Sequence, residues 1–161
     1  ALCFHDDLER AWKIYPGAPV IAVNDASREV EAIALFSLHP ERLMSFRWVE
    51  RQRKFHDDFT VHGTSARVGM PWVNHWWPDA VSGGSSAWGA RKLAWLMGFN
   101  PVVLCGCPLE IGPYTGYRPA QLMSEQKTMD AFHRSIEAEP EWRDGVSSMS
   151  GWSARYLGEP C

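Results

Sequence analysis

A loop rich in glycine and serine stands directly before a predicted helix in the stretch SGGSSAWGARKLAWLMGFNPVVLCG, residues 82–106. The first backbone N–H groups of a helix have no partner inside the helix, and the helix dipole makes that end positive. Glycine lets a phosphate approach the backbone closely, and serine adds hydroxyl donors, so the combination suits a phosphate group. The candidate phosphate contacts are Ser82, Gly83, Gly84, Ser85 and Ser86.

Two interpretations of this loop remain open. It lacks the Gly-Lys-Ser/Thr ending of a Walker A motif, and it is not the GxGxxG motif of dinucleotide-binding folds. A serine that only caps the following helix also accounts for the sequence. The loop is therefore a candidate phosphate site or an ordinary helix start.

Short apolar stretches alternate with helical ones along the chain, and these elements must position the loop. Strands are predicted over residues 20–23, 32–38, 59–63, 101–106 and within 144–152, and helices over 6–15, 41–55, 87–97 and 118–139. Such alternation is typical of parallel strands joined by right-handed helical crossovers. We expect an α/β, Rossmann-like three-layer sandwich with a mainly parallel sheet, in one domain over residues 1–161.

Polar residues follow the predicted strands. Asn24 and Asp25 follow the first strand, His39 follows the second, and Gly106 to Glu110 follow the fourth. Ligands of open α/β sheets bind beyond the carboxyl ends of the strands. We therefore expect these residues to lie at one edge of one sheet.

Three tryptophans and a histidine crowd the segment PWVNHWWPD, residues 71–79. Tryptophan buries a large apolar area and keeps one polar atom, so the segment suits packing, a ligand-stacking lid or an oligomer contact such as a homodimer. These alternatives remain open. The segment RWVERQRKF, residues 47–55, is basic and is predicted to be a solvated helix face.

Charge and composition exclude several classes of protein. The net charge of −3 argues against a general nucleic-acid binder, which has a basic excess. The sequence has no run of eighteen apolar residues and no signal-peptide pattern, so no membrane partner and a cytoplasmic location are expected. The four cysteines lack the spacing of zinc ligands and are expected to be reduced thiols.

The stretch SGGSSAWGARKLAWLMGFNPVVLCGCPLE, residues 82–110, resembles the hallmark of a Rossmann-like superfamily. That superfamily includes bacterial sialyltransferases that use CMP-sialic acid, 6-hydroxymethylpterin pyrophosphokinase-like domains, and small phage and proteobacterial proteins. The shared pattern is a Ser/Gly loop, a helix of small residues, Leu-Gly followed by Tyr or Phe, and an apolar strand that ends in glycine. The resemblance extends to VIAVNDA, residues 20–26, and SLHPE, residues 37–41.

The resemblance implies a role for several residues. An Asn that ends a strand contacts the nucleotide in this superfamily, and Asn24 corresponds to it. The sialyltransferase-like members also carry tyrosines that stabilise the leaving phosphate and a histidine base, to which Tyr114, Tyr117 and His133 are compared. The implied function is a nucleotide-binding transferase of glycosyltransferase type with a CMP-activated donor.

Three functions stay open on chemical grounds. Transfer from a nucleotide donor requires hydrogen-bond donors for the leaving phosphate and a base, for which His39 or His133 is suited. Pyrophosphoryl transfer requires ATP and Mg²⁺, which a carboxylate such as Asp25 or Glu110 would hold. A domain that binds a nucleotide or a protein without catalysis is the third.

Overall fold

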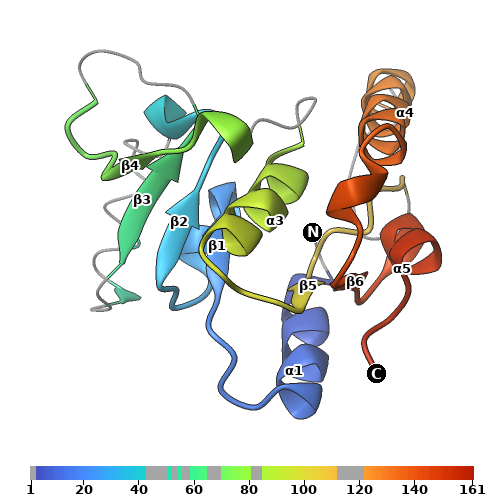
Figure 1. Cartoon of the computed structure of the whole chain (residues 1–161), viewed down its shortest axis with the longest axis horizontal. Coiled ribbons are helices and arrows are strands. Elements are labelled where there is room, and N and C mark those ends of the chain that lie inside the picture. The colour runs from blue at the N-terminus through green and yellow to red at the C-terminus, as the bar shows by residue number, and fades with distance from the viewer. Residues whose placement is uncertain are drawn as a thin grey trace. The chain divides into compact units, whose positions relative to one another are not determined.

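The computed structural model describes residues 3–42, 51, 54–55, 59–64, 70–80, 85–111 and 122–161. These residues form an α/β fold with parallel strands, as the sequence predicts (Figure 1). The chain divides into two compact units, residues 19–96 and residues 1–18 with 97–161, and each is described by itself. The single domain over residues 1–161 stays a prediction. None of the described helices has the length and apolar character needed to cross a bilayer.

The unit of residues 19–96 contains a four-stranded parallel sheet in the order β1-β2-β3-β4. The strands are β1 (Ile21–Val23), β2 (Ala34–Phe36), β3 (Thr60–Gly63) and β4 (His75–Trp76). All three residues of β2 are buried, which is the pattern of an inner parallel strand covered on both faces. The first three strands confirm predictions, whereas β4 lies in the tryptophan-rich segment 71–79, where no strand was predicted.

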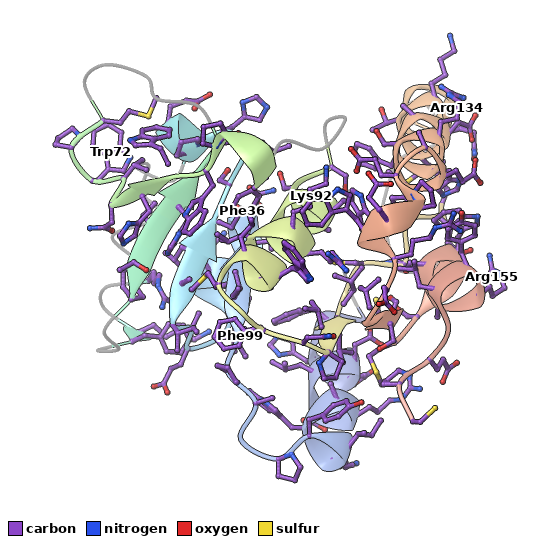
Figure 2. All side chains as sticks on the ribbon, viewed as in Figure 1. Phe36, Trp72, Lys92, Phe99, Arg134 and Arg155 are labelled. Atoms are coloured by element: carbon purple, nitrogen blue, oxygen red, sulfur yellow. The ribbon has the colours of Figure 1, made fainter. Side chains whose placement is uncertain are left out.

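Helix α3 (Ser86–Leu96) packs on the sheet through a glycine. The sequence predicts a face of small residues, and Ala90 and Ala94 are indeed buried. The closest approach lies at Gly89, where an added Cβ would stand 2.9 Å from the Phe36 ring and from the Ala80 carbonyl oxygen. Figure 2 shows Phe36 of β2 beside α3. The helix ends at Leu96, and Gly98 follows it with a φ of +88°, the left-handed conformation common after a helix end.

The described residues of this unit also form the 3-10 turns η1 (Asn24–Arg28) after β1, η2 (Pro40–Arg42) after β2 and η3 (Pro78–Ala80) after β4. Arg51 holds the first of them, since its guanidinium donates hydrogen bonds to the carbonyl oxygens of Ser27 and Val30, the latter at 3.0 Å. Its Cζ also lies 4.6 Å from the centroid of the Phe59 ring. The prediction of a solvated face is therefore wrong for Arg51, which is 1% exposed. A cluster of basic residues predicts an exposed helix face, but it does not show that one arginine of the cluster is buried and donates hydrogen bonds to backbone carbonyl groups.

The second unit contains two parallel strands, β5 (Val102–Leu104) and β6 (Val146–Ser148), which pair with each other. Its helices are α1 (Phe4–Ile14), α4 (Leu122–Glu137) and α5 (Gly151–Leu157), with the 3-10 turn η5 (Pro140–Trp142). The prediction that residues 102–104 join the sheet of β1 is wrong. An apolar run predicts that a strand forms. Which other strand it pairs with depends on contacts with residues far away in the sequence, so the run alone does not predict the pairing.

Helix α1 begins two residues earlier than the sequence predicts. The predicted helix covers residues 6–15, yet the helix starts at Phe4 and Cys3 occupies the N-cap position without a side-chain hydrogen bond. Asp7 therefore lies inside the first turn and is buried with Leu8 and Ala11. A carboxylate in that position must find partners in the rest of the unit.

We expect Gly89→Ala to lower the free energy of unfolding by about 1–3 kcal/mol, because the added methyl group must displace the Phe36 ring or the Ala80 carbonyl. The loss is net of the better helix propensity of alanine, which is worth about 1 kcal/mol. Urea denaturation measures the change. Phe36→Leu should reduce the cost of Gly89→Ala in a double-mutant cycle, and a stabilising Gly89→Ala would show that the helix does not approach so closely.

Candidate functional site

A chain of hydrogen bonds links polar residues at the carboxyl ends of β1 and β2. The Ser37 hydroxyl donates to Oδ1 of Asn24 at 2.7 Å, and the Ser37 oxygen accepts the backbone N–H of His39 at 3.0 Å. Nδ1 of His39 lies 3.2 Å from a carboxylate oxygen of Glu41. We call these four residues, Asn24, Ser37, His39 and Glu41, the carboxyl-edge cluster.

The local backbone places the first two members of the cluster. Asn24 is the first residue after β1 and has a φ of +51°, a left-handed conformation that asparagine tolerates better than most residues. Ser37 is the first residue after β2, and its backbone N–H donates to the His62 carbonyl of β3 at 3.2 Å. Ser37 is 1% exposed, so its hydroxyl needs partners inside the protein, and Asn24 and His39 supply them.

The cluster leaves an amide group oriented for a ligand. Because Oδ1 of Asn24 accepts from Ser37, its Nδ2 atom presents the donors, and these make no hydrogen bond within the described part of the chain. Asn24 is exposed. The side chain is thus held in one orientation and offers N–H groups to an acceptor atom of a bound molecule.

The histidine of the cluster has the arrangement of a general base. The Glu41 carboxylate only accepts hydrogen bonds, so it selects the tautomer of His39 with the proton on Nδ1. Nε2 then carries a lone pair that can take a proton, and the His39 side chain is 52% exposed. The pairing with Glu41 was missed in the sequence, although the spacing of two residues across Pro40 was a visible signal.

The Ser/Gly loop is described only at its end. Ser85 is buried, and its hydroxyl accepts the backbone N–H of Trp88 at 3.3 Å, as a serine N-cap does. Ser86 is the first residue of α3 and is partly exposed, and Asp25 is exposed in η1. Ser82, Gly83 and Gly84 lie outside the described residues. Ser85 therefore acts as the N-cap of α3. That the loop contacts a phosphate stays a prediction.

The remaining candidates belong to the unit with β5 and β6. The prediction that Gly106 to Glu110 lie at the same sheet edge as Asn24, Asp25 and His39 is therefore wrong. The backbone N–H of Gly106 donates to Asp7, and Glu110 forms an ion pair with Arg155 of α5, a residue labelled in Figure 2. Nε2 of His133 lies 2.5 Å from the Leu109 carbonyl oxygen, and its ring stacks on Trp152 at 3.7 Å between centroids. Tyr114 and Tyr117 lie outside the described residues.

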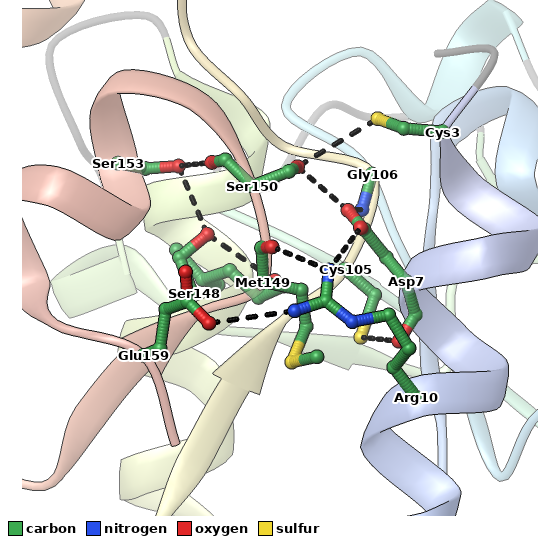
Figure 3. A network of polar contacts seen from close by, with 11 residues as sticks. Cys3, Asp7, Arg10, Cys105, Gly106, Ser148, Met149, Ser150, Ser153 and Glu159 are labelled. Atoms are coloured by element: carbon green, nitrogen blue, oxygen red, sulfur yellow. Dashed lines mark hydrogen bonds and ion pairs between the residues drawn. The ribbon is translucent and has the colours of Figure 1, made fainter.

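A buried carboxylate explains why Gly106 is held where it is (Figure 3). Oδ2 of Asp7 accepts the Gly106 backbone N–H at 2.9 Å and the Ser150 hydroxyl at 2.7 Å. Arg10 lies one turn later, 3.8 Å from Oδ1 of Asp7, and donates to the Met149 carbonyl at 3.1 Å. The network therefore ties α1 to the segments that follow β5 and β6. The signal in the sequence was an acidic residue on the same helix face as Leu8 and Ala11.

The cysteines of this unit are free thiols. Burial raises the pKa of Cys105 and of Cys107 to about 12 each, and burial also raises the pKa of Cys3. Thiols with such pKa values stay protonated at neutral pH and are poor nucleophiles and metal ligands. Among the described residues, no three His, Cys, Asp or Glu side chains gather closely enough to hold a metal ion.

We expect Asp7→Ala to lower the free energy of unfolding by about 2–4 kcal/mol, because it leaves the donors of Gly106 and Ser150 without their carboxylate. Asp6→Ala is the matched control, since Asp6 is an exposed carboxylate in the same helical turn. It should cost well under about 1 kcal/mol. Chemical denaturation of both variants tests the network, and equal losses would contradict it.

Comparisons with known proteins assign no family to the chain. No protein-family model matches it, nor does any curated protein or solved structure. The superfamily resemblance in residues 20–41 and 82–110 therefore stays an expectation from the sequence.

Proposed function

We propose that the unit of residues 19–96 binds a nucleotide at the carboxyl edge of its parallel sheet and forms the donor site of a transferase. The observation that carries the proposal is the carboxyl-edge cluster, which joins an oriented amide to a His–Glu pair through one buried serine. Its location, beyond the carboxyl ends of β1 and β2, is where open α/β sheets bind ligands.

Asn24 is the proposed nucleotide contact. Its Oδ1 is occupied by Ser37, so the group that it recognises must be an acceptor, such as a carbonyl oxygen or ring nitrogen of a base or a hydroxyl of the ribose. The orientation is fixed before binding, which reduces the entropy lost when the ligand binds. A nucleotide-activated sugar supplies such acceptors.

His39 is the proposed base. The acceptor hydroxyl forms a bond to the anomeric carbon of the sugar, the bond from that carbon to the phosphate oxygen breaks, and the nucleotide leaves with the electron pair. Nε2 of His39 takes the hydroxyl proton, and the Glu41 carboxylate stabilises the resulting imidazolium. Atoms and charge balance without a redox step.

We expect the protein to be stabilised thermally by CMP or CDP without Mg²⁺, and Asn24→Ala to weaken that binding about 5-fold, since a hydrogen bond contributes about 1 kcal/mol. UDP, ADP and ATP, each with and without Mg²⁺, complete the titration. Gln126→Ala is the matched control, because Gln126 is an exposed amide of α4 outside the cluster. A shift only with ATP and Mg²⁺ would favour pyrophosphoryl transfer, and no shift with any nucleotide would refute the proposal.

We expect His39→Gln to retain nucleotide affinity but to slow release of CMP from CMP-sialic acid about 100-fold, because a general base contributes roughly that factor. Glu41→Gln should slow it less, since the imidazole keeps its place but loses the charge that stabilises the imidazolium. Rapid-quench measurements of CMP release separate the chemical step from binding. Tight nucleotide binding with no turnover in the parent protein would support a non-catalytic binding domain instead.

A further inference from the structure

A buried histidine joins the last two strands of the four-stranded sheet. His62 of β3 is 2% exposed, and both of its ring nitrogens have partners. The Trp77 indole N–H donates to Nδ1 at 2.9 Å, and Nε2 lies 2.6 Å from the Thr60 hydroxyl oxygen. The ring of His75, on β4, stacks on His62 with 5.0 Å between centroids.

The partners fix the protonation state of His62. An indole N–H is a donor only, so Nδ1 of His62 must be unprotonated to accept it. The single proton of the neutral ring is then on Nε2 and is donated to the Thr60 hydroxyl. His62 is therefore a neutral imidazole that accepts a hydrogen bond at Nδ1 and donates one from Nε2.

Protonation of His62 is incompatible with these bonds. A second proton on Nδ1 would face the Trp77 N–H, so two donors would point at each other. Burial, and to a smaller extent the neighbouring His75, lower the pKa of His62 to about 4. His75 from β4 is the titratable group that acts on His62. Thr60 and Trp77, which hydrogen-bond to it, and Phe36, its register partner on β2, carry no charge.

Strand β4 meets β3 along a short ladder. It is two residues long, with His75 paired to His62 and Trp76 paired to Gly63. Besides this ladder, the Asn74 N–H donates to the Val61 carbonyl at 2.9 Å and the Trp77 N–H donates to the Gly63 carbonyl at 2.8 Å. The Asn74 side chain adds a bond from the Val61 N–H at 2.7 Å. The Trp77–His62 bond adds a side-chain link between β3 and the residue that follows this short strand.

We propose that Thr60, His62 and Trp77 form an acid-sensitive latch that holds β4 against β3 while His62 is neutral and releases β4 when His62 takes a proton. The released state binds that proton with the ordinary histidine pKa of about 6.5, and the latched state binds it about 300-fold more weakly. The latch is therefore fully stable above about pH 6.5 and weakens as the pH falls toward about 4.

Amide hydrogen exchange tests the latch in the full chain. At about pH 5, after correction for the intrinsic exchange rate, the amides of Asn74 and Trp77 should lose about 20-fold in protection relative to neutral pH. The amide of Phe36, in β2, should change much less, because the release is confined to the edge strand. Protection of Asn74 and Trp77 that is unchanged down to about pH 4 would overturn the proposal.

Two variants separate the latch from general acid denaturation. In His62→Gln the amide can still accept from Trp77 and donate to Thr60 but takes up no proton, so the pH dependence of protection at Asn74 and Trp77 should disappear. His5→Gln, which removes an exposed histidine of α1, should behave like the parent protein. An acid response that persists in His62→Gln would contradict the latch.

Nitrogen NMR of the parent protein tests the latch even if His62→Gln does not fold. The His62 ring should show the tautomer with the proton on Nε2 at neutral pH, and it should titrate well below about 6.5. A proton on Nδ1, or an ordinary titration midpoint, would refute the proposal.

Discussion

The buried carboxylate of Asp7 is the interaction on which the unit with β5 and β6 depends. One oxygen atom accepts from residues that are 99 and 143 positions away in the sequence. Burial of a carboxylate is costly unless it is hydrogen-bonded, so the segments that bring Gly106 and Ser150 to it must stay together. In the other unit the Ser37 hydroxyl also joins two segments, because it donates to the Asn24 side chain and accepts the backbone N–H of His39. In each unit, one satisfied buried oxygen orders the loops beyond the strand ends.

The elements of the fold could be predicted from the sequence, but their partners could not. Apolar stretches indicated β1, β2, β3 and β5, a short strand was predicted within residues 144–152 where β6 lies, and a helix was predicted over residues 6–15 where α1 lies. Strand β4 was missed because two residues are too few to show a pattern, and α5 because its seven residues begin with a glycine. That β5 pairs with β6, rather than joining the larger sheet, depends on contacts between residues far apart in sequence.

In the candidate site, too, the individual residues could be predicted from the sequence, whereas the contacts between them could not. Asn24 and His39 were found because a residue that follows a parallel strand lies at the edge where ligands bind. Their connection through Ser37 was not visible, since it depends on how two neighbouring strands align. Gly106, Glu110 and His133 have the residue types of a site, but their described partners, Asp7, Arg155 and Leu109, lie within their own unit. Residue type therefore identifies candidates, and strand pairing decides which of them meet.

The close contact at Gly89 has a consequence for the orientation of α3. Successive residues of a helix are about 100° apart around its axis. A rotation of α3 by one residue would bring Trp88 or Ala90 against the Phe36 ring, where there is no room even for the Cβ of alanine at position 89. The glycine thus fixes the angular setting of the helix on the sheet. Ser86, three residues earlier, therefore faces one defined direction, whatever the loop before it binds.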